Sequence, residues 1–110
     1  PIIPETERQW AQLVRLEARG RMRHLLPPGT ILCLPTTPFP APKRGEPLSV
    51  AGPQRDRLLC LCCHGGLTGV PQVSIPGTLV DGLPVGLSVV GGPGSDATLV
   101  AVACALEGRG

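Results

Sequence analysis

Near its start the chain carries apolar residues at helical spacing. Across residues 5–26 they fall mostly three or four positions apart, and this spacing predicts one amphipathic helix. Pro27-Pro28-Gly29 predicts the end of the helix, because proline cannot continue it. The apolar stripe of the predicted helix is formed by Trp10, Leu13, Val14, Ala18, Met22 and Leu25.

A short, continuous apolar run at residues 30–34 predicts a buried strand. Prolines recur over residues 35–42, and they favour an extended backbone because proline fixes its own φ and restricts the residue before it. Residues 43–53 are predicted to form a loop. A second helix is predicted over residues 55–64, with Gly65-Gly66 ending it.

Two apolar, β-branched runs, at residues 70–75 and 85–90, predict two more strands. Asp81-Gly82 is a turn dipeptide between them, so the two runs are predicted to pair as a hairpin with a long loop. Ser95 or Asp96 is expected to cap a last helix that reaches about residue 107.

The predicted order is helix, strand, helix, strand, strand, helix, which is an α/β arrangement. Both faces of residues 85–90 are apolar or small, which indicates cover on both sides of a sheet. So few strands leave backbone N–H and C=O groups unpaired. We therefore expect a partial mixed sheet with flanking helices, made of a helix and turn (1–29) and a sheet-core segment (30–110). The start at Pro1, without Met, agrees with a fragment.

The formal net charge of +2 is too small to indicate a nucleic acid or an anionic membrane as partner. No apolar run reaches the roughly 18 residues that a membrane span needs. The five cysteines are odd in number and partly clustered, and no signal-peptide pattern precedes them. These features predict reduced thiols and a cytoplasmic location. Four arginines of the first helix are interpreted as a solvated face: Arg15, Arg19, Arg21 and Arg23.

The segment 60–64 contains C-x-x-C-H, the attachment pattern of c-type haem. Cys60, Cys63 and His64 also share a helix face, as zinc ligands would, but a structural zinc site needs a fourth ligand. We prefer a third interpretation, a buried helix face rich in cysteine. No metal and no cofactor is predicted. Residues 92–97 fit G-x-G-x-x-A, yet the second strand and acidic residue of a dinucleotide site are missing, so a loop-to-helix junction is preferred.

Hydrolytic chemistry by an activated serine needs a nucleophile, a base and an oxyanion hole. The four serines (Ser49, Ser74, Ser88 and Ser95) are scattered, and none lies in G-x-S-x-G. Lys43 is the only lysine, and neither histidine has an evident carboxylate partner in the sequence. No catalytic residue is predicted.

Four segments occur in an order that resembles the end of amidase-signature enzymes. Residues 31–38 form an apolar run with P-T-T-P, followed by Ala41-Pro42. Residues 66–77 resemble N-L-x-G-x-P-x-x-S-x-P, with Gly66 where Asn is common. Residues 81–91 resemble G-L-P-V-G-L-Q-L-V-G, with Ser88 at the usual Gln. Asp96 and Leu99 resemble a D-x-x-L helix opening.

The resemblance implies the C-terminal part of the amidase-signature fold, in a protein that hydrolyses amides with a Ser nucleophile, a second Ser and a Lys base. Those residues belong to a glycine- and serine-rich signature that is absent here, so no catalytic role transfers and the fragment alone is expected to be inactive. The pocket wall is what transfers: Cys62, Thr36 and Thr37 are the expected substrate-binding residues. The implied partners are a small-molecule amide and the missing N-terminal part of the same domain. A non-catalytic amidase-like receptor or subunit stays open as an alternative.

Overall fold

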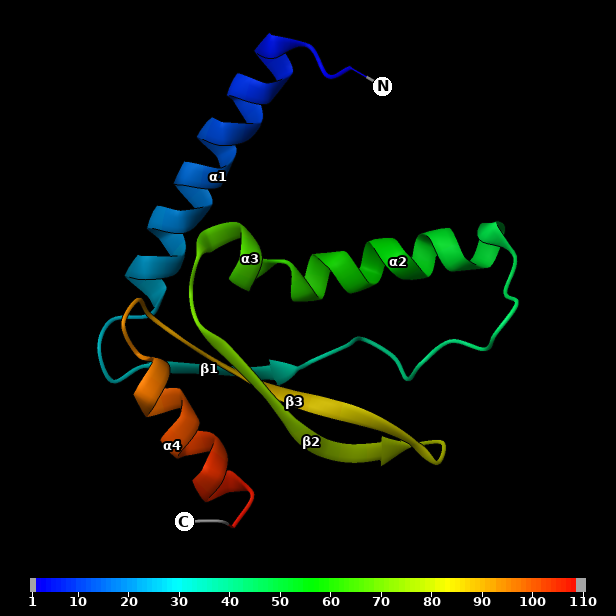
Figure 1. Cartoon of the computed structure of the whole chain (residues 1–110), viewed down its shortest axis with the longest axis vertical. Helices are drawn as coiled ribbons and strands as arrows, with labels where there is room; N and C mark the ends of the chain where they lie inside the picture. The colour runs from blue at the N-terminus through cyan, green and yellow to red at the C-terminus, as the bar shows by residue number, and fades with distance from the viewer. Residues whose placement is uncertain (1, 109–110) are drawn as a thin grey trace.

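One twisted, antiparallel sheet with strand order β1-β3-β2 forms the centre of the computed structural model, which describes residues 2–108 (Figure 1). The expected α/β class is confirmed, and within this chain the described strands are all antiparallel. The elements in chain order are α1 (Glu5–Leu25), β1 (Ile31–Pro35), α2 (Leu48–Cys62), α3 (His64–Thr68), β2 (Gln72–Val80), β3 (Leu83–Gly91) and α4 (Asp96–Leu106).

The second helix is longer than the pattern predicts, because α2 begins at Leu48 and includes Pro53. The prediction of a loop over residues 43–53 is therefore wrong for its second half. Proline costs a helix one backbone hydrogen bond, and here the helix continues through that loss. Gly65-Gly66 does not end a helix either: both residues lie inside α3, which ends at Gly69 in the left-handed conformation (φ 74°).

The hairpin between β2 and β3 is confirmed, but its strands are longer and its loop shorter than predicted. Asp81 and Gly82 alone form the loop, with φ of 52° and 77°, as a two-residue turn of the type I′ kind requires. Pro76 does not end β2; it lies inside the strand, next to a register shift between Pro76 and Thr78. Pro76 lies beside this bulge, and β2 is an edge strand of the sheet that the described residues form, so the missing N–H is tolerated there.

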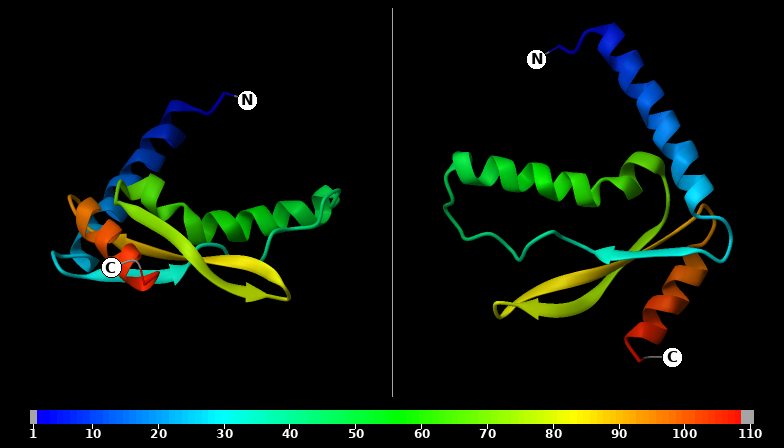
Figure 2. Two further views of the ribbon diagram at one scale, coloured as in Figure 1. Left: turned by 60° about the horizontal axis from the view of Figure 1, so that its bottom comes forward. Right: turned by 180° about the vertical axis from the view of Figure 1, so that it is seen from behind.

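The two faces of the sheet are covered by different helices (Figure 2). Leu34 and Val90 lie on the face where Leu26, Val70 and Met22 form a small core with them. On the other face α4 packs against β2 and β3, and its fully buried Leu99 lies close to the backbone of the last β3 residue. Ser95 precedes α4, but its hydroxyl donates to the Gly92 carbonyl (2.5 Å) and caps no helix amide.

Large apolar side chains stay exposed in this arrangement. Trp10 is 69% exposed and Leu13 65%, on α1, which extends well beyond the sheet (Figures 1 and 2). The radius of gyration is 16.6 Å, against about 13 Å for a compact domain of this length. The chain therefore buries a small core relative to its length. No described helix has the length and apolar character needed to cross a membrane.

Candidate functional site

Thr36, the residue that follows β1, is hydrogen-bonded through every polar group it has. Its N–H donates to the Gly86 carbonyl (2.8 Å), which extends the pairing of β1 with β3 by one residue. Its Oγ1 lies 2.7 Å from Ser74 Oγ and 2.8 Å from Ser88 Oγ. Its carbonyl accepts a hydrogen bond from the Cys62 thiol (2.7 Å). The strand exit is therefore fixed to all three strands and to the end of α2.

The three hydroxyls of Thr36, Ser74 and Ser88, here called the hydroxyl cluster, are brought together by the strand register. Ser74 and Ser88 are directly opposite each other on β2 and β3. Thr36 lies opposite Gly86, one step beyond the Pro35–Leu87 pair. Residues two apart on a strand share a face, so Gly86 lies on the same face of β3 as Ser88, beneath the Thr36 and Ser74 hydroxyls.

Gly86 provides the space that the cluster occupies. A Cβ at this position would lie 2.8 Å from Thr36 Oγ1 and 2.9 Å from Ser74 Oγ, closer than a carbon atom can approach an oxygen without displacing it. Ser88 is fully buried, whereas Ser74 lies at the exposed edge of the sheet. The cluster therefore runs from the interior of the sheet to its surface.

Cys62 is half-buried, and its thiol is aimed at the sheet. Burial raises the pKa of the Cys62 thiol, and the neighbouring Cys63 raises it further, because a second thiolate beside it would repel the charge. A thiol held in its protonated form can donate a hydrogen bond, which agrees with the contact to the Thr36 carbonyl. Cys62 therefore acts here as a donor that holds α2 against the strand exit.

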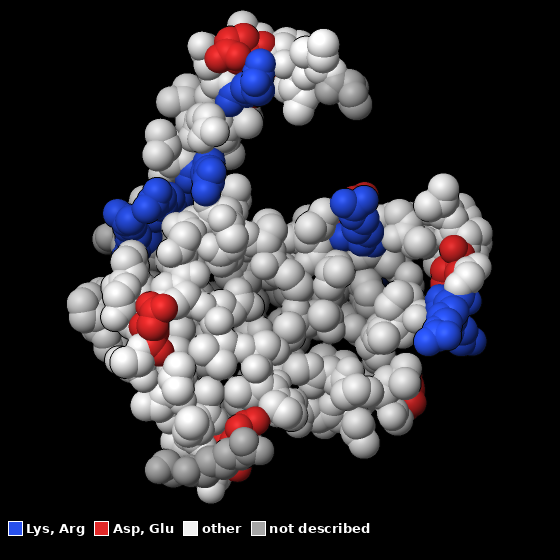
Figure 3. All heavy atoms as spheres, in the orientation of Figure 1, with Lys and Arg blue, Asp and Glu red and all other residues white. Residues whose placement is uncertain are grey.

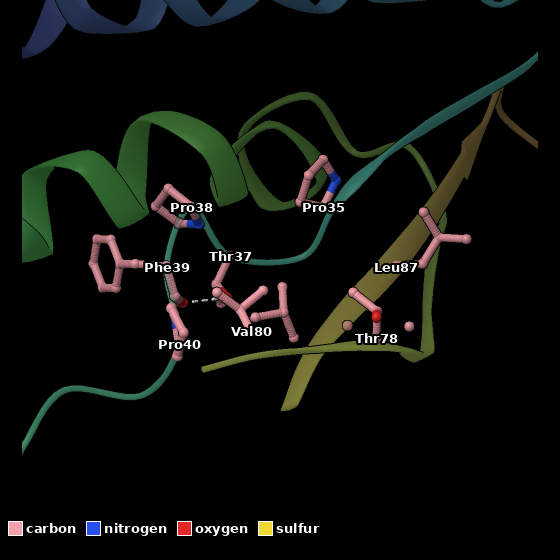
Figure 4. Close-up of a pocket in the computed structure, with 11 residues that line it drawn as sticks. Pro35, Thr37, Pro38, Phe39, Pro40, Thr78, Val80 and Leu87 are labelled. Atoms are coloured by element: carbon pink, nitrogen blue, oxygen red, sulfur yellow. Dashed lines mark hydrogen bonds between the residues drawn. The ribbon is translucent and has the colours of Figure 1, made fainter. Parts of the chain in front are cut away.

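Thr37 faces a different region from Thr36. Its hydroxyl donates to the Phe39 carbonyl (2.8 Å) within the proline-rich segment, as Figure 4 shows. Thr37 lines a cavity of about 540 Å³ together with Pro35, Val85 and Leu87. Pro35 is next to Thr36 in the chain, and Leu87 is next to Ser88, so their side chains point to the face opposite the hydroxyl cluster. The cavity thus lies against the opposite face of the sheet. Of the three expected substrate-binding residues, Thr36 and Cys62 are in contact with each other, whereas the Thr37 side chain lies on the other side of the sheet.

Ser74, Ser88 and Gly86 are the members of this site that sequence reasoning misses. The two serines look scattered in the sequence, since they are 14 residues apart in the chain. The available signal is the hairpin itself: a turn centred on Asp81-Gly82 that is corrected for one bulge residue places Ser74 opposite Ser88.

The other motifs form no comparable arrangement among the described residues. Within residues 2–108, no group of three or more His, Cys, Asp or Glu side chains lies close enough to hold a metal ion. Cys60 and Cys63 are exposed and Cys62 is half-buried, so the preferred interpretation of a buried, cysteine-rich helix face is wrong for the described structure. His64 Nε2 is buried without a hydrogen-bond partner among residues 2–108. The C-x-x-C-H residues therefore gain no further ligand from the part of the chain that the structure describes.

The basic side chains of α1 are engaged locally or dispersed. Arg21 pairs with Glu17 (2.6 Å), Arg8 with Glu5 (3.2 Å), and Arg15 Nε donates to the Leu67 carbonyl (3.0 Å). In Figure 3 the blue Lys and Arg atoms lie in separate groups, along α1 and beside α2. The described residues on the face in that view form no continuous basic surface.

The geometry defines an α/β segment with a hydrogen-bonded strand exit, in which the hydroxyls of Ser74 and Ser88 are bonded to Thr36 rather than to a histidine or lysine. Residues 4–100 match the family model described as Amidase, and the chain belongs to this family. A solved structure described as "Crystal structure of amidase" superposes with a TM-score of 0.84 and 30% identity, over 97% of this chain and 26% of that one.

Curated relatives give the same family. The chain is 38% identical to Amidase 1 of Oryza sativa subsp. japonica over 91 residues, which are 83% of this chain and 21% of the relative. It is 42% identical over 77 residues to a glutamyl-tRNA(Gln) amidotransferase subunit of Symbiobacterium thermophilum, covering 69% of this chain and 15% of that protein. The chain thus spans about a fifth or less of the length of these relatives.

Proposed function

We propose that this chain is the C-terminal segment of an enzyme that hydrolyses carbon–nitrogen bonds of amides. The longer polypeptide that contains it is called the parent protein below. The observation that carries the proposal is the family match over residues 4–100, in a chain that spans only 15–21% of its relatives. In this proposal the catalytic Ser, second Ser and Lys lie outside the chain.

The reaction proceeds through an ester intermediate on the nucleophilic Ser. Its hydroxyl oxygen attacks the amide carbonyl while the base takes its proton. The carbon–nitrogen bond then breaks, and the nitrogen leaves as ammonia or an amine after receiving that proton. Water next attacks the acyl ester, which releases the carboxylic acid and restores the Ser hydroxyl. No cofactor takes part.

The segment contributes a wall of the substrate pocket and completes the core. Thr36 and Cys62 fix the end of α2 over the sheet, on the face that carries the hydroxyl cluster, and Thr37 lies in the adjoining proline-rich segment. The N-terminal part of the same domain is the proposed partner that covers Trp10 and Leu13 and pairs with the backbone N–H and C=O groups of the free sheet edges. Exposed apolar groups of this size favour such cover. The five free thiols support a cytoplasmic location.

The test compares the parent protein with residues 1–110 alone on simple primary amides, with ammonia release as the measurement. Turnover by the parent and none by the isolated segment is the expected result. A parent variant whose signature Ser is replaced by Ala serves as the matched inactive control. Turnover by residues 1–110 well above the blank would refute the assignment of catalysis to the missing part.

A non-catalytic role as an amidase-like receptor or subunit is the second candidate. Several relatives are named as subunits of an amidotransferase, which favours a place in a larger assembly; these names neither assign nor exclude catalysis. The residues encoded before Pro1 decide between the two: a glycine- and serine-rich signature with its Ser and Lys supports the enzyme, and its loss supports the receptor or subunit.

A further inference from the structure

The hydroxyl cluster has one more O–H proton than it has hydrogen bonds between its members. Three hydroxyls carry three protons, and the two hydrogen bonds that join them through Thr36 use two. One O–H is therefore left to donate elsewhere, and the two hydrogen bonds through Thr36 are the side-chain hydrogen bonds that these hydroxyls form within residues 2–108. Which of the three hydroxyls keeps this proton depends on where an unpaired donor costs least.

Burial decides the direction of the two hydrogen bonds. Ser88 is fully buried, and Thr36 is its side-chain partner among the described residues. If Ser88 accepted from Thr36, its own proton would be buried without an acceptor, which is costly. Ser88 therefore donates to Thr36. If Ser74 also donated to Thr36, the half-buried Thr36 proton would be left without an acceptor, whereas Ser74 is exposed and an unpaired proton there reaches solvent. Thr36 therefore donates to Ser74. Each donation polarises the next hydroxyl, so the outermost O–H is the strongest donor.

The remaining O–H belongs to Ser74, on the exposed edge strand β2. It borders a hollow of about 470 Å³, and none of the described residues that line this hollow is charged. Residues from both faces of the β2–β3 hairpin line the hollow, with Ser74 on the cluster face and Thr78 and Val85 on the other. Ser74 connects the hollow to the Cys62 contact through Thr36, whose Oγ1 is 2.7 Å from Ser74 Oγ. On the face that carries Ser74, the side chains that line the hollow are aliphatic or proline: Pro76, Leu79 and Pro84.

We infer that Ser74 is a substrate-binding residue, which donates its hydroxyl proton to an uncharged oxygen acceptor on the acyl part of the amide. Thr36 and Ser88 are positioning residues that fix its direction. A neutral carbonyl or ether oxygen with apolar neighbours fits the hollow, whereas a carboxylate or ammonium group finds no counter-charge among the described residues that line it. The inference rests on the proposed function, since it names the substrate class of that enzyme.

The test uses the parent protein and two amides that differ by one acceptor, 5-oxohexanamide and hexanamide. Dissociation constants come from ligand-observed NMR and kcat/KM from ammonia release. The wild type is expected to favour the keto amide roughly 3- to 10-fold, as for one hydrogen bond between neutral groups. Ser74→Ala is expected to bring the ratio to about one, and Ser74→Thr, which retains the hydroxyl, to preserve it.

Positioning is tested separately. Thr36→Val removes the acceptor and donor that orient Ser74, so the preference for the keto amide should fall, and Thr36→Ser should restore it. Ser49→Ala, an exposed serine on α2, is the matched control and leaves the ratio unchanged.

A failure of the Ser74 contact and a failure of the proposed amidase function give different results. Hydrolysis of both amides with a ratio that Ser74→Ala does not alter overturns the Ser74 contact and keeps the proposed function. A keto preference in binding that Ser74→Ala abolishes, without turnover of either amide, keeps the contact and overturns the function.

Discussion

Cys62 and Thr36 are 26 residues apart, and the thiol of the first donates to the carbonyl of the second over 2.7 Å. This contact joins the end of α2 to the strand exit, beside the hydroxyl cluster. It also favours the protonated thiol, because a thiolate could not donate and would lie in a partly buried place.

Cys62 should therefore react slowly with iodoacetamide in the folded parent protein. The thiolate is the reactive form, and a raised pKa lowers its population at about pH 8. Cys60 and Cys63, which are exposed on the same helix end, are the internal controls and should be alkylated first. Mass spectrometry of peptides over a time course gives the order, and the rate at Cys62 should rise steeply with pH. Alkylation of Cys62 ahead of Cys60 would contradict the contact.

The same pKa shift links Cys62 to stability at alkaline pH. Because the folded-state pKa lies above the unfolded one, the thiol's contribution is full below the unfolded pKa and is lost as the pH rises through the folded pKa. The free energy of unfolding of the parent should thus fall at alkaline pH, and Cys62→Ala should show a shallower fall. Urea denaturation at several pH values measures it, with Cys60→Ala as the control. Equal slopes in all three proteins would count against the buried, protonated thiol.

Gly86→Ala should destabilise the parent protein by about 1–3 kcal/mol, because the added methyl group displaces Thr36 and Ser74. Gly20→Ala is the matched control: a Cβ there has nothing within 4 Å, and the position is inside α1. That substitution should be neutral or stabilise by up to about 1 kcal/mol. Urea denaturation compares the two, and a tolerated Gly86→Ala would show that the cluster is looser than the distances indicate.

The sequence predicts the order of the elements because each depends on local pattern. The stripe of α1, the prolines at residues 27–28 and the Asp81-Gly82 turn all act over a few residues, and all appear where expected. The start of α2 is harder to place because Pro53 is locally unfavourable to a helix. The extent of β2 is harder to place because proline is tolerated inside a strand only at an edge or a bulge, and both depend on how the strands pair.

The candidate site is harder to predict than the fold. A family pattern points to Thr36 and Cys62, and the structure brings them into contact. Their role as substrate-binding residues stays a prediction. Ser74 and Ser88 join Thr36 only through strand register, and a single bulge between Pro76 and Thr78 shifts that register. No local pattern in the sequence reports where such a bulge falls.

The isolated 110 residues should be loosely folded. Leu99, Val89 and Val90 are fully buried, but Trp10, Leu13 and other large side chains are exposed, and the radius of gyration exceeds that of a compact domain. We expect a broad thermal transition, binding of ANS and a tendency to aggregate. Circular dichroism, ANS fluorescence and light scattering test this, with the parent protein as the control. A sharp, cooperative melt from a monomer would refute the proposal that the rest of the domain covers these faces.

Gly82→Ala should destabilise the β2–β3 hairpin by about 1 kcal/mol, because Gly82 has φ of 77° and a side chain in this left-handed region meets its own backbone. Asp81→Asn is the control at the neighbouring position, where φ is 52°, because Asn tolerates the same conformation. The free energy of unfolding of the parent protein is the measurement. A loss for Asp81→Asn as large as for Gly82→Ala would mean that the Asp81 carboxylate, rather than the backbone conformation, stabilises the turn.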